Sequence, residues 1–283
     1  MIVKTMLSKL GFLLNTAILA GEAILDVYDG EFDVEFKTDE SPLTEADKRS
    51  HEIIKRRLEE MNPSLPIVSE EGAVIPYSVR SRWPAFWLVD PLDGTKEFVN
   101  RNGEFTVNIA LIENKTPVVG VVYVPVKKNC YFAVHGSGAF RRDGGEIIEM
   151  ASDEILASSK RLPLSRAGTG EDDSITVVAS RSHATGEAND FADRLKKIYR
   201  EVVFTPAGSA MKLCLVAEGS ADLYPRHGPT MEWDIGAGQC VVEQSGGKVI
   251  SLETENPLIY NKKCLKNSFF ICSRKGFFLK HVS

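Results

Sequence analysis

Apolar residues recur at helical spacing at the start of the chain. Five of them share one face of a helix with 3.6 residues per turn: Leu7, Leu10, Leu14, Ile18 and Leu25. We expect this helix over residues 5–28, because Gly30 then stands where helices commonly end. A second helix is expected to open within residues 41–47 and to run to about Met61, stopped by Pro63.

Short runs rich in β-branched and aromatic residues follow these helices. The expected strands are residues 86–89, 104–112, 117–126, 131–134 and 138–140, with one more directly before Ser69. Pro91 is expected to end the hydrogen bonding of the strand at residues 86–89 and to turn the chain. Asn102-Gly103 is typical of a tight β-hairpin turn. Consecutive strands with short turns predict an antiparallel sheet, covered on one side by the two opening helices.

Strands and helices alternate in the second half of the chain. The expected strands are residues 174–179, 201–205 and 221–224, and the expected helices are residues 189–199, 210–218 and 233–244. This alternation predicts an α/β sheet with mixed strand order. A length of 283 residues fits two domains, and residues 151–173 have the loosest composition. We therefore expect an N-terminal helix-plus-antiparallel-sheet domain over residues 1–160 and an α/β domain over residues 161–283.

Composition and charge exclude several classes of protein. With 43% apolar and 26% charged residues, the chain is typical of a soluble globular enzyme and unlike a disordered one. A net charge of -5 argues against a nucleic acid polymer as partner, because such binding rests on Lys and Arg neutralising phosphates. The five cysteines have no CxxC spacing, which indicates free thiols in a reducing cytoplasm rather than disulfides or a zinc site.

The first twenty residues also resemble a signal peptide faintly. Asn15 and Thr16 interrupt the apolar run, however, and the apolar residues fit one helical face, so an amphipathic helix of the folded protein is favoured. No run is expected to reach the apolar length of a membrane-spanning helix.

Carboxylates follow a buried strand at Asp90 and Asp93. Gly94, next to them, adopts backbone conformations that other residues avoid, so a plain turn is one reading of this stretch. An EF-hand calcium loop is excluded, because the third and fifth positions counted from Asp90 are Leu92 and Gly94. The other reading is a site for a hard divalent cation such as Mg²⁺, which binds carboxylate oxygens.

Two further carboxylates have the same setting. Glu70 follows a short apolar strand and Asp234 opens a helix, each in glycine-containing sequence. Clustered carboxylates repel one another and raise each other's pKa, so such a cluster calls for cations. Two or three Mg²⁺ ions that hold a phosphate would account for the set. A helix beginning at Gly94-Thr95 would add backbone N–H groups that point at phosphate oxygens.

Two segments resemble the signatures of the inositol monophosphatase superfamily of Mg²⁺-dependent, lithium-sensitive phosphatases: residues 88–95, Leu-Val-Asp-Pro-Leu-Asp-Gly-Thr, and residues 233–238, Trp-Asp-Ile-Gly-Ala-Gly. Ser69-Glu70-Glu71 is similar to a third metal-binding element of the family. Residues 96–98 and 101–108, the tetrapeptide at residues 180–183 and the run at residues 212–228 resemble the CysQ-type 3'(2'),5'-bisphosphate nucleotidases within it. The resemblance implies a layered α/β/α/β/α sandwich, which agrees with the two halves predicted above.

The resemblance also implies roles for individual residues. The metal ligands would be Glu70, Asp90, Asp93, Asp234 and the backbone carbonyl of Leu92. Thr95, paired with Asp47, would polarise the attacking water, and Glu70 is assigned to catalysis as well. The spacing of Thr44 and Asp47 also predicts a helix cap, and both roles of Asp47 are compatible.

Substrate contacts follow in the same way. Backbone groups of Leu92, Asp93, Gly94 and Thr95 would touch the scissile phosphate, and Glu70 and Asp234 are assigned to substrate binding as well. A second phosphate needs fixed positive charge, for which Lys212 and Arg226 stand in the family's positions, with His183 and Ser209 as further candidates. For a single Lys or Arg, a solvated surface charge is the alternative reading.

The resemblance implies a Mg²⁺-dependent enzyme that hydrolyses a small nucleotide bisphosphate, adenosine 3',5'-bisphosphate, to AMP and phosphate. An inositol or sugar-phosphate phosphatase on the same fold and a non-catalytic metal- and nucleotide-binding module are the alternatives. The expected location is the cytoplasm, with weak peripheral association at the cytoplasmic face of the inner membrane left open. The sequence leaves the oligomeric state open.

Overall fold

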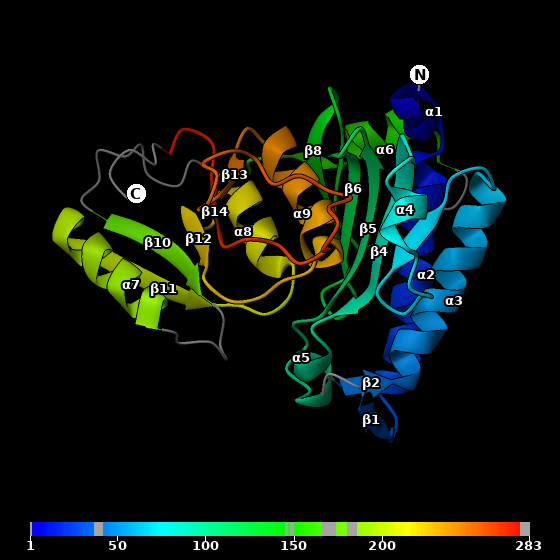
Figure 1. The fold of residues 1–283 in the computed structure, drawn as a ribbon, viewed down its shortest axis with the longest axis horizontal. Coiled ribbons are helices and arrows are strands. Elements are labelled where there is room, and N and C mark those ends of the chain that lie inside the picture. The colour runs from blue at the N-terminus through cyan, green and yellow to red at the C-terminus, as the bar shows by residue number, and fades with distance from the viewer. Residues whose placement is uncertain are drawn as a thin grey trace.

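The chain folds into five alternating layers of helix and sheet. The computed structural model describes residues 2–36, 42–144, 147, 150–165, 174–179 and 186–277. From one end to the other, the layers are the N-terminal helices, a seven-stranded sheet, the helix pair α8 and α9, a five-stranded sheet, and α7 (Figure 1). This order confirms the predicted α/β/α/β/α sandwich.

The outer layer of the first sheet contains α1 (Ile2–Ser8), α2 (Leu10–Tyr28) and α3 (Glu45–Met61). The single predicted first helix is thus two helices that meet at Lys9. Of the predicted apolar face, Leu10 and Leu14 are buried, whereas Leu7, Ile18 and Leu25 are only partly buried. The buried stripe is shifted because α2 packs against both α3 and the sheet, and small residues such as Ala17 and Ala20 line that contact.

By length and composition alone, α2 is apolar enough to cross a membrane, contrary to what was expected from the sequence. Half of its most apolar window is buried inside the protein, however, and a core helix of a soluble protein passes the same test. The packing against α3 and the sheet accounts for the buried half of this window.

The first sheet has the strand order β3-β4-β5-β6-β7-β8-β9. These strands are β3 (Ile67–Ser69), β4 (Ala85–Asp93), β5 (Thr106–Glu113), β6 (Thr116–Val124), β7 (Asn129–Val134), β8 (Gly138–Asp143) and β9 (Lys160–Arg161). All neighbours pair antiparallel except β3 and β4, which are parallel. The predicted antiparallel sheet is confirmed with that exception. Since β9 straddles residue 160, the division into domains at that point stays a prediction.

Pro91 does not end its strand. The pairing steps from Asp90 opposite Asn108 to Asp93 opposite Thr106, so β4 continues through a bulge that contains Pro91. A bulge accommodates the missing N–H of proline and re-aims the side chains around it. The prediction of a turn at Pro91 was therefore wrong, and the chain turns only after Asp93.

The short helix α5 (Thr95–Val99) begins directly after Gly94, which has a φ of 92°. The hairpin predicted at Asn102-Gly103 is absent: these residues lie in the loop between α5 and β5. The tight turn favoured by such a pair needs positive φ at both residues. Here Gly103 has positive φ and Asn102 does not.

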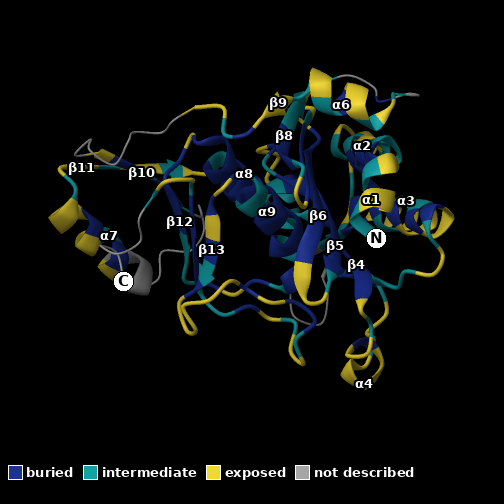
Figure 2. Ribbon diagram, turned by 90° about the horizontal axis from the view of Figure 1, so that it is seen from above, coloured by how far each residue is buried: buried dark blue, intermediate teal, exposed yellow. Residues whose placement is uncertain are grey.

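The second sheet has the mixed order β11-β10-β12-β14-β13, as predicted for the second half. Its strands are β10 (Ser174–Ala179), β11 (Glu201–Pro206), β12 (Leu223–Arg226), β13 (Lys248–Ser251) and β14 (Phe270–Ser273), and its helices are α7 (Gly186–Ile198), α8 (Met211–Glu218) and α9 (Glu232–Gln244). The sequence patterns did not predict β13 and β14. Figure 2 shows α8 and α9 buried between the sheets, with α7 exposed at the edge of the molecule.

The remaining elements are small. They are β1 (Val34–Phe36), β2 (Pro42–Thr44), α4 (Tyr77–Arg80) and α6 (Ser152–Ser158). The strand β2 pairs with β1 and leads directly into α3, which begins at Glu45, within the segment at residues 41–47 where the second helix was predicted to open.

Candidate metal and phosphate site

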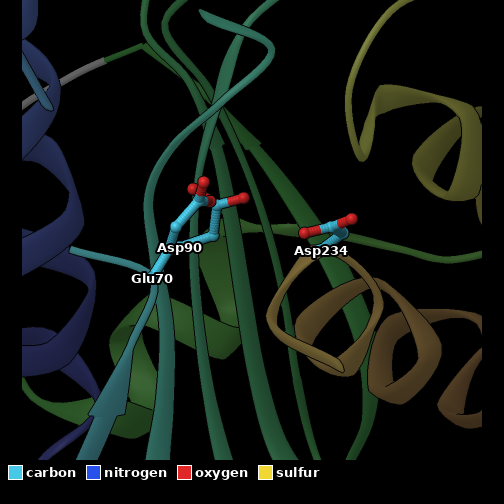
Figure 3. Close-up of side chains that lie close together, drawn as sticks. All are labelled: Glu70, Asp90 and Asp234. Atoms are coloured by element: carbon cyan, nitrogen blue, oxygen red, sulfur yellow. The ribbon is translucent and has the colours of Figure 1, made fainter. Parts of the chain in front are cut away.

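Three carboxylates from three distant segments meet at one edge of the first sheet. Glu70 follows β3, Asp90 lies in β4, and Asp234 lies in the first turn of α9. One oxygen from each side chain lies within 4.8 Å of the others, and Figure 3 shows Asp234 facing Glu70 and Asp90. The structure therefore brings together three of the carboxylates that the sequence singled out.

Local backbone geometry explains this convergence. Because β3 and β4 are parallel, with Ser69 opposite Val89, the next residues, Glu70 and Asp90, lie side by side at the same end of the two strands. The Glu70 N–H donates to the Val89 carbonyl at 3.1 Å and fixes that register. On the other side, the Met231 N–H donates to Asp234 Oδ2 at 2.9 Å, so Asp234 caps α9 while its side chain faces the cluster.

The cluster is electrostatically strained without a cation. Burial, reinforced by the negative charges of Glu70, Asp93 and Asp234, raises the pKa of Asp90 well above its usual range. Burial and the neighbouring Asp93 and Glu70 also raise the pKa of Asp234 strongly. A donor set of carboxylate oxygens this close together, with Asp90 buried and Glu70 and Asp234 partly buried, fits a hard divalent cation such as Mg²⁺.

Asp93 lies beside this group and has its own polar partners. Its Oδ2 accepts from Asn108 Nδ2 at 3.2 Å and lies 3.5 Å from the Thr106 hydroxyl oxygen, and the Ala210 backbone N–H also donates to this carboxylate. Burial raises the pKa of Asp93 from 3.8 to about 6, and the charge of Lys212 opposes this rise. Among the described residues, the group within 4.8 Å does not include Asp93.

Asp47 and Thr95 form the predicted pair. The Thr95 hydroxyl donates to Asp47 Oδ1 at 3.2 Å, and the backbone N–H and hydroxyl of Thr44 both donate to Asp47 Oδ2 at 2.7 Å. One carboxylate therefore caps α3 and holds Thr95 at the same time, with a different oxygen for each. The Thr95 hydroxyl also lies 3.4 Å from the Leu92 carbonyl oxygen, so this carbonyl lies next to the Asp47–Thr95 pair.

A pocket opens beside the cluster. Its walls include six residues that the sequence assigned to the site: Asp93, Gly94, Ser209, Lys212, Arg226 and Asp234. The walls come from the β4–α5 junction, the start of α8, β12 and the start of α9, so both halves of the chain form the pocket.

Two of the three cationic side chains that line the pocket, Lys212 and Arg226, are held in place. Lys212 is 6% exposed, its Nζ donates to the Ser209 carbonyl at 2.7 Å, and it lies 5.5 Å from the centre of the Tyr224 ring. Burial lowers the pKa of Lys212 to about 8, although the charge of Asp93 opposes this shift. The Arg226 guanidinium donates to the Pro229 carbonyl at 2.8 Å. His183 lies outside the described residues.

Sequence reasoning missed several residues of the site. Thr106 and Asn108 are fully buried and contact Asp93, and Glu97 and Tyr224 line the pocket. Two polar residues inside the apolar strand β5 were a usable signal for the first pair, because buried polar groups require partners. The sequence carried no comparable signal for Glu97 and Tyr224.

Comparisons with known proteins agree with this geometry. The model of the inositol monophosphatase family matches residues 8–280. The 3'(2'),5'-bisphosphate nucleotidase CysQ of Salmonella typhimurium is 44% identical over 232 residues, which are 81% of this chain and 85% of that protein. The solved structure of CysQ from Bacteroides thetaiotaomicron is 45% identical, with a TM-score of 0.84 and coverage of 96% of this chain and 97% of that one.

A more distant structure shows the same fold. The extragenic suppressor protein suhB from Bartonella henselae is 24% identical and has a TM-score of 0.73, covering 94% of each chain. The family model spans nearly the entire sequence, and the two solved structures share the fold. The chain belongs to the inositol monophosphatase family.

Proposed function

We propose that this protein is a Mg²⁺-dependent 3'(2'),5'-bisphosphate nucleotidase that converts adenosine 3',5'-bisphosphate to AMP and phosphate. The observation that carries the proposal is a single pocket in which Asp93 and Asp234 face Lys212 and Arg226. Such a pocket offers an acidic end for metal ions and a cationic end for a second anion. The relatives named as bisphosphate nucleotidases support the same substrate class.

The ions would be held by the carboxylates of the site. The proposed ligands for two or three Mg²⁺ ions are Glu70, Asp90, Asp93, Asp234 and the carbonyl of Leu92. When bound, the ions supply an activated water and neutralise charge on the phosphate. The high pKa of Asp90 supports this assignment, because a nearby cation would stabilise the ionised carboxylate.

Asp47 and Thr95 orient the attacking water in this proposal. Since the Thr95 hydroxyl donates its hydrogen to Asp47, the lone pairs of its oxygen accept a hydrogen bond from water. Asp47 then accepts the proton that moves along this hydrogen bond as the water attacks, and Glu70 is assigned to catalysis as well. The backbone of Gly94 and Thr95 contacts the scissile phosphate.

The second phosphate of the nucleotide is bound at the cationic end. Lys212 acts as a fixed point charge and Arg226 as a bidentate donor, with Ser209 and His183 as further contacts. An inositol monophosphate, the substrate in the family's name, carries no second phosphate for Lys212 to bind. Two buried or partly buried cations in the pocket therefore favour the bisphosphate over the inositol ester.

The proposal extends to the organisation of the protein. Residues 1–160 would supply most of the metal ligands and residues 161–283 would complete the nucleotide pocket. A cytoplasmic location is proposed on the basis of the free cysteines, of which four are buried.

Steady-state kinetics test the proposal. Purified protein with Mg²⁺ is assayed against adenosine 3',5'-bisphosphate and inositol 1-phosphate, and kcat/KM is expected to be higher for the nucleotide. A preference for inositol 1-phosphate would overturn the substrate assignment. Failure to turn over either ester, together with tight nucleotide binding, would favour the non-catalytic binding module.

A further inference from the structure

The loop before α8 rests directly on the segment that follows α5. The Gly208 N–H donates to Glu104 Oε2 at 2.9 Å, across 104 positions of sequence. A Cβ on Gly208 would lie 2.7 Å from Glu97 Cγ and 2.8 Å from the Glu104 carbonyl oxygen. Only glycine permits this approach, so the two halves of the chain are in close contact at this point.

This loop carries the groups that define the cationic end of the pocket. Ser209, the residue after Gly208, has a φ of 46°, a conformation that a non-glycine residue keeps only when its surroundings hold it. The Ser209 carbonyl accepts from Lys212 Nζ at 2.7 Å. The next residue, Ala210, donates its N–H to Asp93. The place of Lys212 relative to Asp93 therefore depends on the path of the loop.

We propose that Glu104 is a positioning residue that fixes this loop, and with it Lys212, and so sets the selectivity for substrates that carry a second phosphate. The inference rests on the proposed function and deepens it. Glu104 is not among the residues that line the pocket, so it acts through Gly208 and Ser209. A carboxylate suits this role because its hydrogen bond to a backbone N–H is charge-assisted and short.

The alternative is that Glu104 merely holds the two halves together. A purely structural role would weaken turnover of every substrate alike, because the acidic cluster also includes residues of both halves. A positioning role would instead weaken only substrates whose second phosphate contacts Lys212. Comparing a bisphosphate with a monophosphate separates the two roles.

The test compares kcat/KM for adenosine 3',5'-bisphosphate and adenosine 3'-monophosphate in wild type, Glu104→Ala, Glu104→Asp and Glu104→Gln. For Glu104→Ala, we expect KM for the bisphosphate to rise about tenfold and kcat/KM for the monophosphate to stay within about twofold. Glu104→Gln keeps an oxygen that accepts from the Gly208 N–H, so its selectivity should remain near that of wild type. Glu104→Asp withdraws the carboxylate by one methylene and should resemble Glu104→Ala.

Glu59→Ala on the exposed face of α3 is the control for loss of one negative charge, and it should leave both substrates unchanged. An equal loss for both substrates, or unchanged selectivity in Glu104→Ala and Glu104→Asp, would overturn the inference. If Glu104→Ala does not fold, the more conservative Glu104→Asp decides by the same criterion. The proposed function fails separately, through absence of bisphosphate turnover in the wild type.

Discussion

Thr95 and Asp47 are joined by a 3.2 Å hydrogen bond across 48 positions of sequence. The other oxygen of the same carboxylate accepts two hydrogen bonds from Thr44 and caps α3. Asp47 is 1% exposed, so water does not compete for either set of hydrogen bonds. The carboxylate of Asp47 therefore links the N-terminal ends of α3 and α5. The hydroxyl of Thr95 is thereby held beside the carbonyl of Leu92.

Thr95→Val tests the catalytic part of this arrangement without disturbing the cap. Valine keeps the shape of threonine and lacks the hydroxyl that would orient water, so kcat is expected to fall at least about 100-fold, with little change in the melting temperature. Thr44→Val is the matched control: it removes a hydroxyl from the other oxygen of Asp47, should lower stability by about 1 kcal/mol, and should change kcat only slightly. Wild-type kcat in Thr95→Val would rule out the proposed role.

Asp93→Asn tests the metal assignment. The change preserves size but removes a negative charge from the site, so kcat is expected to fall by about three orders of magnitude or more while nucleotide binding persists. Single-turnover kinetics and calorimetric titration with AMP measure the two effects. Asp33→Asn, on the surface before β1, is the control and should behave like wild type. Equal turnover by Asp93→Asn and wild type would show that the site lies elsewhere.

Asn108→Ala tests a residue that acts through Asp93. Thr106 donates to Asn108 Oδ1 at 3.0 Å, which turns the Asn108 amide nitrogen toward Asp93. Groups that orient a ligand in this way typically contribute about 10- to 100-fold to metal affinity. We expect the Mg²⁺ concentration for half-maximal activity to rise about tenfold, with most of kcat recovered at saturating Mg²⁺. An unchanged Mg²⁺ dependence would contradict this role.

Lys212→Ala tests the binding of the second phosphate. Because the lysine would contact a phosphate that does not react, it stabilises substrate and transition state alike, and its loss should raise KM for the bisphosphate with kcat largely retained. Turnover of adenosine 3'-monophosphate should change little. Lys248→Ala, exposed at the start of β13, is the matched control. A large fall in kcat for both substrates would instead place Lys212 at the reacting phosphate.

The stability of the metal-free protein should depend on pH through Asp93. Burial raises its pKa from 3.8 to about 6, so the folded state binds the proton more tightly than the unfolded state. This contribution to stability is present below pH 3.8 and is lost as the pH rises through about 6. The melting temperature of wild type relative to Asp93→Asn should therefore fall between those limits without metal. A relative rise over this range would contradict the raised pKa.

Patterns of neighbouring residues predicted the parts of the protein that depend on local chemistry. The opening segment at residues 41–47 and the stop at Pro63 indicated α3, and the spacing of Thr44 and Asp47 indicated its cap. Glu70 and Asp90 were recognisable because each follows a short run of apolar residues. These features could be predicted because capping, helix periodicity and strand ends are set by residues only a few positions apart.

Contacts between distant segments decided the rest. The bulge at Pro91 depends on how β5 pairs with β4, and the hydrogen bond from Asn108 to Asp93 depends on that bulge. The contact between Glu104 and Gly208 exists only because the layers bring residues 104 positions apart within hydrogen-bond distance. The sequence by itself determined which chemical groups this protein possesses and the local elements that carry them. Only the tertiary structure decided which groups face one another, because that depends on packing between layers rather than on neighbouring residues.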